Sequence, residues 1–485
     1  MSKESSILKN LSVMTLSVGV TQVIALVLKM LMPRIFGPEK MGIFFFAESF
    51  SSLFFAFLPL GLSTYISRTL PPKPDHVKDI LWTVLWVQAV TALLIGAALY
   101  GALVWQGRDY ETIKITLIMG GYAALFTFQK DILQKIYVIL GEVVMISRLN
   151  VLVKLILVTG SVVILFTAPS IAWIAAMHLL SEAFSFIYLL RLANKSDFIR
   201  ATRRAPYLVP MLKVSLPFYL AGVLNGVYAQ IDIFMLSQYA NKVEVGYFGS
   251  AFKIIGICLF LIPVFQNAIT PALSKALAEN LDLFTAMVKD FMRTLMIASL
   301  PLAVGLTLFG DVISSILNGP EFAPAYRTVA FLTPVLVMMY LNTFMGASLY
   351  LASSGKKLSI IFITGGLINL ALDYFLIPWG LMKYGPGGAG LAISFATFLC
   401  ELYVFCVMLY MLPQRVISAR LVFNGLLIFV PCWLGIYYHD LVASMTIPSR
   451  IGLFLLVIPY ALVTAMVTRT DVARVIAMLP SKAKR

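Results

Sequence analysis

Charged residues are scarce in this sequence. Asp, Glu, Lys and Arg together make up 12% of its 485 residues, against about 25% in a soluble globular protein, which argues against a water-soluble fold. Cysteine and histidine are also few, with four and three residues, and none of them stands in a CxxC or zinc-binding spacing. These absences exclude a disulfide scaffold and argue against a metal site.

Apolar residues are abundant: they make up 60% of the chain, and its mean hydropathy is +0.92. A helix needs about 20 apolar residues to cross a bilayer, and Pro, Gly and charged residues divide this chain into about fourteen such spans. The runs do not alternate with a period of two, which excludes a membrane β-barrel. We predict an all-α polytopic membrane protein. The predicted spans are 8–32, 41–67, 80–105, 115–139, 149–167, 171–192, 211–237, 245–270, 292–317, 326–352, 358–378, 389–412, 421–438 and 451–468.

The distribution of basic residues predicts the orientation in the membrane. The net charge of +15 is not gathered in one patch, so nucleic acid is not an expected partner. If the N-terminus is cytoplasmic, the inner loops carry roughly three times as many Lys and Arg residues as the outer loops, in agreement with the positive-inside rule. We therefore expect both termini in the cytoplasm, which requires an even number of spans.

The two halves of the chain resemble each other. At an offset of 204 residues, Gly42 aligns with Gly246 and Pro59 with Pro263. Six spans per half place both halves in the membrane in the same direction, the parallel-repeat arrangement of transporters whose substrate path runs between two lobes. The predicted parts are a six-helix lobe at 1–193, a basic cytoplasmic linker at 194–210, a second six-helix lobe at 211–412, and helices 13 and 14 with a basic tail at 413–485.

Four ionisable residues within the predicted spans form a pattern. Lys29 and Glu48 in the first lobe, and Asp232 and Lys253 in the second, occupy nearly equivalent repeat positions, about 10 Å below the outer surface at 1.5 Å per residue. A charge at mid-membrane costs roughly 2.5–3.5 kcal/mol, so it usually faces protein or water. We predict that Lys29 pairs with Asp232, and Glu48 with Lys253, across the lobe interface, so that the two carboxylates close an outer gate. The alternative is that each charge pairs within its own lobe.

Other charged residues in the spans have simpler interpretations. Lys130 and Lys154 lie toward the cytoplasmic half, and their long side chains can snorkel to the cytoplasmic interface. Glu182, Asp373 and Glu401 are interpreted as packing or hydrogen-bonding residues.

The sequence contains no defensible catalytic motif. The three histidines are far apart, and neither a Walker A motif nor a Ser/His/Asp arrangement is found. Residues 385–390 match GxGxxG, but no βαβ unit surrounds them, so the dinucleotide-binding interpretation fails. We interpret these glycines as a tight turn with close packing at the start of the twelfth span, and we do not expect an enzyme.

Several segments resemble a known family. Residues 33–42 (PRIFGPEKMG) and 60–68 (LGLSTYISR) are similar to the opening of bacterial Wzx-type oligosaccharide flippases, the polysaccharide transport family of the multidrug/oligosaccharidyl-lipid/polysaccharide exporter superfamily. Residues 230–236 (QIDIFML) and 245–248 (VGYF) are similar to later segments of that family. Each motif is degenerate, so the order and spacing of the motifs carry the resemblance.

The resemblance implies two lobes around a central cavity lined by spans one, two, seven and eight. It implies transport of an undecaprenyl-diphosphate-linked oligosaccharide from the cytoplasmic to the outer leaflet of the bacterial inner membrane by alternating access. The implied partners are the lipid-linked substrate, a polysaccharide polymerase and a chain-length regulator. No cofactor is implied, and coupling to H⁺ or Na⁺ or to the membrane potential stays open. The cavity cations expected to meet the headgroup are Lys29, Lys253, Arg68, Lys130 and Lys154, with Glu48 and Asp232 as gate or coupling carboxylates.

Three other functions stay open. A cation-coupled multidrug antiporter of the same superfamily would exchange cations at Glu48 or Asp232, although Lys29 and Lys253 at the same depth disfavour a cationic drug. A flippase for the lipid-linked peptidoglycan precursor would share the same chemistry. An envelope polymerase or ligase is expected to carry a large outer loop with Arg or His, whereas the outer loops predicted here are short.

Overall fold

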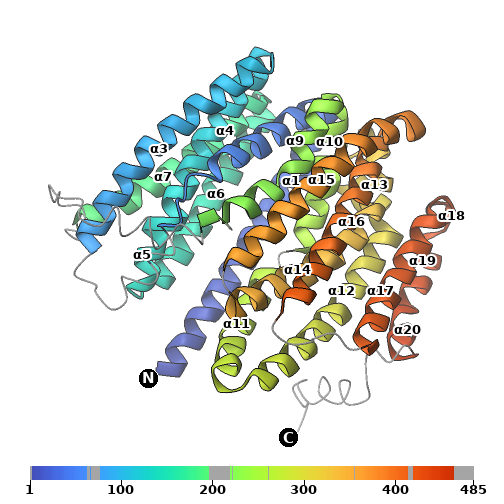
Figure 1. Cartoon of the computed structure of the whole chain (residues 1–485). Helices are drawn as coiled ribbons and strands as arrows, with labels where there is room; N and C mark the ends of the chain where they lie inside the picture. Colours follow the sequence, from blue (N-terminus) through green and yellow to red (C-terminus); the bar gives the residue numbers. More distant parts are fainter. Residues whose placement is uncertain are drawn as a thin grey trace, which may run out of the picture.

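The computed structural model describes residues 3–62, 66, 77–195, 219–220, 222–259, 261–353, 355–412 and 419–463. Within these ranges every regular element is a helix, and eight helices are long and apolar enough to cross a membrane (Figure 1). Each predicted span falls at least partly on one or more helices. The prediction of an all-α membrane fold is therefore confirmed. The predicted linker at 194–210 lies almost entirely outside the described residues.

The first half of the chain packs as one group of helices around α1 and α4, drawn in blue and teal in Figure 1. Asp109 begins α4, because its side chain accepts hydrogen bonds from the backbone N–H and the hydroxyl of Thr112, a standard N-cap. A short π-helical turn follows α4. The elements are α1 (Lys3–Phe55), α3 (Val77–Trp105), α4 (Tyr110–Phe128), η2 (Gln129–Leu133), α5 (Gln134–Ile139), α6 (Val143–Thr167) and α7 (Ile171–Lys195).

Helix α1 consists of two arms joined by a sharp turn. The turn is at Gly37, whose φ of 68° and ψ of 176° are not helical. A glycine adopts such a positive φ without the steric penalty of a Cβ, and Pro33 and Pro38 flank the turn. Lys29 on the first arm and Glu48 on the second line the same cavity, so the two arms correspond to the first two predicted spans.

The second half forms a second group, drawn from green to red in Figure 1. Helices α17 and α19 pack against the outside of α12. The elements are α9 (Ile231–Tyr239), α10 (Lys242–Cys258), α11 (Leu261–Glu279), α12 (Leu281–Asn318), η3 (Pro320–Ala325), α13 (Tyr326–Phe331), α14 (Thr333–Ala352), α15 (Gly355–Tyr384), α16 (Gly388–Met411), α17 (Ala419–Tyr437), α18 (His439–Ser444), α19 (Ile447–Leu455) and α20 (Val457–Val463).

The two groups meet where α1 crosses α10, at the end of the molecule away from the start of α1 (Figure 1). We call this end the distal face. A Cβ at Gly42 would lie 1.8 Å from the carbonyl oxygen of Lys242, and a Cβ at Gly246 would lie 1.9 Å from that of Pro38. Both glycines therefore allow backbone-to-backbone contact. Gly42 and Gly246, like Pro38 and Lys242, are separated by the offset of 204 residues that was seen in the sequence.

Candidate functional site

Three lysines and one glutamate line a small central cavity between the two halves. The cavity measures about 150 Å³. Lys29 and Glu48 come from the two arms of α1, Lys154 from α6 and Lys253 from α10. Pockets that hold small molecules usually measure roughly 300–1,000 Å³, so the cavity is constricted in this conformation.

An ion pair crosses this cavity from one half to the other. The ammonium group of Lys253 donates hydrogen bonds to both carboxylate oxygens of Glu48, at 2.8 and 3.0 Å. The same ammonium lies 5.7 Å from the centre of the Phe45 ring, within the range of a cation–π contact. The pair of Glu48 and Lys253 forms as predicted from the repeat.

The other two lysines give the cavity a surplus of positive charge. Within the described ranges, neither Lys29 nor Lys154 forms an ion pair with a carboxylate. Lys154 points into the cavity rather than snorkelling to the interface. Tyr122 and His178 also line the cavity, and His178 Nδ1 lies 2.9 Å from the carbonyl oxygen of Ile174. The cavity wall thus carries three ammonium groups and the Glu48 carboxylate, while the carboxylate of Glu182, which also interacts with Lys154, lies outside the wall. This lining is suited to an anion.

The predicted pair of Lys29 and Asp232 does not form. Asp232, near the start of α9, turns toward α15 and α16, where it accepts hydrogen bonds from Asn369 Nδ2 at 2.5 Å and Thr397 Oγ1 at 2.9 Å. At the repeat offset the counterpart of Lys29 is Ile233, and one residue rotates a side chain by about 100° around a helix. The spacing predicted the depth of Asp232 but not the face of the helix on which it lies.

Asp232 instead belongs to a buried group of carboxylates within the second half. Asp373 on α15 interacts electrostatically with Asp232 and is fully buried, and its two oxygens have no hydrogen-bond partner among the described residues. Glu401, one turn after Thr397 on α16, accepts a hydrogen bond from the hydroxyl of Tyr228 at 3.0 Å. Glu401 is thus a hydrogen-bonding residue, as predicted. The grouping with Asp232 was not predicted, although polar residues spaced four apart on both helices indicate a shared polar face.

Of the two remaining predicted cations, Lys130 and Arg68, the structure describes only Lys130. Lys130 is exposed, with its ammonium group 5.2 Å from the centre of the Phe126 ring, and it does not line the cavity. Arg68 lies outside the described residues. Of the five predicted headgroup cations, the structure brings together Lys29, Lys154 and Lys253.

Polar side chains also join the two halves at the distal face, a feature that the sequence analysis missed. Arg34 of α1 donates hydrogen bonds to the carbonyl oxygens of Ser315 and Ile316, at 3.2 and 2.6 Å. These carbonyls belong to the last turn of α12, where that of Ser315 also accepts a hydrogen bond from the backbone N–H of Gly319. The arginine therefore caps a helix of the opposite half.

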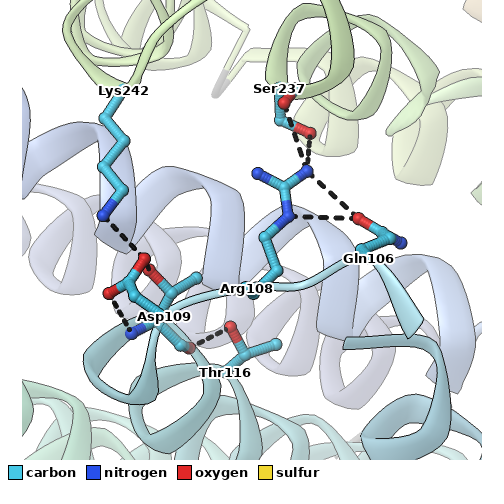
Figure 2. Close-up of polar contacts among 7 residues, drawn as sticks. Gln106, Arg108, Asp109, Thr116, Ser237 and Lys242 are labelled. Atoms are coloured by element: carbon cyan, nitrogen blue, oxygen red, sulfur yellow. Dashed lines mark hydrogen bonds and ion pairs between the residues drawn. The ribbon is translucent and has the colours of Figure 1, made fainter. Parts of the chain in front are cut away.

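A second set of polar contacts follows α3, and Figure 2 shows it from close by. Arg108 donates a hydrogen bond to the carbonyl oxygen of Ser237 at 3.1 Å, and Lys242 pairs with Asp109 at 2.7 Å. Together with Arg34 and the glycine contact of α1 and α10, these residues form what we call the distal seam. The seam lies beside the central cavity, because Met41, the neighbour of Gly42, lines that cavity.

The sequence model of the family described as "Polysaccharide biosynthesis protein" matches residues 7–277, which is more than half of the 485 residues. The chain belongs to this family. The resemblance found in the motifs of the sequence is thereby confirmed. A comparison with curated proteins finds no match in sequence.

Solved structures show how widely this family's fold is shared. The chain is similar to the lipid II flippase MurJ in an inward closed conformation, with a TM-score of 0.72 and 16% identity over 95% of this chain and 99% of MurJ. It is also similar to an inward-facing multidrug resistance transporter of the MATE family, with a TM-score of 0.62 and 16% identity over 80% of this chain and 93% of the other. A third similar structure is a transporter of the MOP superfamily from Pyrococcus furiosus, with a TM-score of 0.58 and 16% identity over 83% of this chain and 94% of the other. At such identities the likeness shows a common fold.

The ion pair of the distal seam is insensitive to pH over the physiological range. Burial opposes the charge of Asp109, but hydrogen bonds from Lys242 and Thr112 outweigh it, and the pKa of Asp109 falls from 3.8 to about 2. Because the pKa is lower in the folded state, the stabilisation by this pair is complete above the unfolded value and is lost only as the pH falls through about 2. This ion pair therefore persists in mildly acidic surroundings.

We expect the distal seam to open more often in an Asp109→Asn variant, which lacks the ion pair. A fall in pH from about 8 to 5 should not have this effect, because Asp109 stays charged. The readout is labelling of a cysteine at Ser250, a buried residue of the central cavity, by an impermeant thiol reagent from the distal side, after the four native cysteines are changed to serine. Glu111→Gln, which alters an exposed acid in the first turn of the same helix, is the matched control. The expectation would be contradicted if, with Asp109 in place, labelling of the cysteine at Ser250 rose steadily as the pH fell toward 5.

Proposed function

We propose that this protein is a flippase that carries an undecaprenyl-diphosphate-linked oligosaccharide repeat unit from the cytoplasmic to the outer leaflet of the bacterial inner membrane, for surface polysaccharide assembly. The observation that carries the proposal is the surplus of lysine charge in the central cavity. A diphosphate linkage bears about two negative charges, and lysine ammonium groups bind phosphate as compact, exchangeable point charges. Membership of the polysaccharide biosynthesis family supports a saccharide as the transported group.

In the proposed cycle, the structure described here is the state closed at the distal face, which the predicted orientation places outside the cell. The headgroup enters from the cytoplasmic side and its diphosphate binds Lys29 and Lys154, while the isoprenyl chain stays in the lipid. Opening of the distal seam separates Gly42 from Gly246 and releases the polar contacts of Arg34, Arg108 and Lys242. The saccharide then leaves toward the outer leaflet.

Two sources of energy fit this cycle. Moving two negative charges outward across 100 mV, negative inside, is favoured by about 4.6 kcal/mol, twice the value for one charge. In addition, the unpartnered oxygens of Asp373 beside Asp232 offer a buried site at which H⁺ or Na⁺ binds during the cycle. Replacing Na⁺ by choline at constant pH, in vesicles of fixed potential, separates the two cations: transport coupled to Na⁺ stops, and transport coupled to H⁺ continues.

The proposal is tested by removing the surplus charge. Lys29→Gln and Lys154→Gln are each expected to lower the transport rate about tenfold or more, since a hydrogen bond to a charged group contributes roughly 1.5–3 kcal/mol, and the double variant is expected to be inactive. The measurement is the appearance of lipid-linked repeat units on the outer leaflet of proteoliposomes, detected with an added glycosidase. Lys114→Gln, which neutralises an exposed lysine of α4, should leave the rate unchanged.

Two outcomes would overturn the proposal. One is a Lys29→Gln/Lys154→Gln variant that transports the repeat unit as fast as the unaltered protein. The other comes from a deletion strain: unchanged surface polysaccharide together with drug hypersensitivity would favour the multidrug antiporter. Accumulation of lipid-linked repeat units on the inner leaflet of that strain would support the flippase.

A further inference from the structure

A second cavity lies at the distal face of the second half. It measures about 810 Å³ and is bounded by the end of α12, by η3 and α13, by the turn between α15 and α16, and by α18. This volume is within the range of roughly 300–1,000 Å³ that holds small-molecule ligands, and it is larger than the central cavity. The transport step described above does not use it.

The glycine motif singled out in the sequence builds one wall of this cavity. Gly387 has a φ of 82°, and its backbone N–H donates a hydrogen bond of 2.6 Å to the carboxylate of Glu244. A Cβ at Gly387 would lie 2.5 Å from the carbonyl oxygen of Pro324. The motif is therefore a tight turn with close packing, as predicted, and it fixes Tyr384, the last residue of α15, at the rim of the cavity.

The cavity is charge-balanced, unlike the central one. Asp440 pairs with Arg327 at 2.7 Å, and Asp311 pairs with Arg450 at 2.6 Å. Burial, followed by the positive charge of Arg327, lowers the pKa of His439, so its imidazole is neutral at physiological pH. A cavity with every charge compensated offers no net attraction to a free phosphate or to a cation.

The chemistry of the wall suits a neutral, hydroxyl-rich ligand. Tyr326 and Tyr384 line the cavity, and a tyrosine combines an apolar ring face with a polar tip. A saccharide has the same two characters, an apolar face of C–H groups and a rim of hydroxyl groups. The guanidinium of Arg327 offers fixed donors and the carboxylate of Asp440 offers acceptors, which match neighbouring hydroxyl groups of a sugar ring.

One helical turn separates this cavity from the central one. Ser315 and Ile316, in the last turn of α12, line the distal cavity, and Asn318 of the same turn lines the central cavity. Arg34 holds this turn through the carbonyl oxygens of Ser315 and Ile316. When the distal seam opens, Arg34 leaves, and the partition between the two cavities loses its support from the first half.

We infer that the distal cavity is an exit subsite that binds the neutral saccharide part of the substrate after it has left the central cavity. The two cavities then divide the substrate by its chemistry: the lysines hold the diphosphate, and the tyrosine-lined cavity receives the sugar. This inference rests on the proposed function, since it takes the saccharide to be the group that crosses.

The test is calorimetric titration of the purified full chain with two separate probes. The first probe is the repeat-unit oligosaccharide released by mild acid from the lipid-linked intermediates of the cells that make this protein, free of lipid and phosphate. Tyr384→Ala is expected to weaken its binding about tenfold, the loss typical of one aromatic contact. Tyr410→Ala, which removes a tyrosine that is 86% exposed at the far end of α16, should leave the binding unchanged.

The second probe is farnesyl diphosphate, a short lipid diphosphate without sugar. Tyr384→Ala should bind it as the unaltered protein does, which also shows that the variant is folded. Oligosaccharide binding that is absent, or that is unaffected by Tyr384→Ala, would overturn the exit subsite. Oligosaccharide binding that depends on Tyr384, in a protein that does not bind farnesyl diphosphate, would support the distal subsite and count against the proposed diphosphate flippase.

Discussion

Gly42→Ala is expected to lower transport by an order of magnitude or more, although it adds a single methyl group. That methyl group would lie 1.8 Å from the carbonyl oxygen of Lys242, so α1 and α10 cannot approach as they do in the closed seam. Overpacking of this kind costs about 1–3 kcal/mol, which shifts the ratio of closed to open conformations roughly 5- to 150-fold. Because the cost falls only on the closed conformation, the variant should fold normally and rest in the open one.

The measurement combines transport in proteoliposomes with labelling of a cysteine at Ser250 from the distal side. Gly42→Ala should raise labelling while it lowers transport, and Gly246→Ala should do the same, since its methyl group would lie 1.9 Å from the carbonyl oxygen of Pro38. Gly101→Ala is the matched control, because nothing lies within 4 Å of its position. If Gly42→Ala transports normally and keeps Ser250→Cys protected, the glycine contact is not a gate.

A second large effect is expected from exchanging the charges of Glu48 and Lys253. Glu48→Lys leaves the central cavity with four lysines and no acid, and Lys253→Glu places two glutamates together. The side chains of Lys253 and Glu48 are 40% and 36% exposed, so solvent screens the pair in part. Loss of one partner is expected to cost about 1–2 kcal/mol, roughly five- to thirtyfold in rate, because the other charge is left without a partner. The double variant restores an ion pair across the interface and should recover most of the activity.

This recovery, measured as the coupling energy of a double-mutant cycle of transport rates, is the decisive result. A comparable exchange of Lys275 and Glu279, an exposed pair on one turn of α11, should have no effect. No recovery in the double variant would mean that the two residues act independently, and that the pair seen in the structure is not needed for transport.

The spans and one ion pair between the two halves could be predicted from the sequence because each depends on a local or periodic feature. Apolar runs of helical length predict the helices, and the shared offset predicted the pairing of Glu48 with Lys253. These predictions hold even when the predicted boundary of a span is wrong by a residue or two. The error for Asp232 shows the limit, because one residue of displacement is enough to turn a side chain to another face.

Other parts of the candidate site could not be predicted because they depend on tertiary contacts between distant elements. Arg108 and Asp109 lie in a short polar connection that looks like an ordinary turn, and their partners are more than a hundred residues away. The distal cavity joins α12, α13, α15 and α18, which no spacing in the sequence relates. Of this cavity, only the glycine turn at its rim was predicted from the sequence, and it was interpreted as a site of close packing.

The offset of 204 residues relates the two glycine contacts as in a two-fold dimer fused into one chain, because Gly42 meets Lys242 and Gly246 meets Pro38. The cavity charges depart from that symmetry, because the counterparts of Lys29 and Lys154 are Ile233 and Leu358. Both of these lysines, which form no ion pair among the described residues, thus belong to the first half. In the proposed cycle, the diphosphate would therefore be held off the pseudo-axis by the first half alone, and the second half could move away from it.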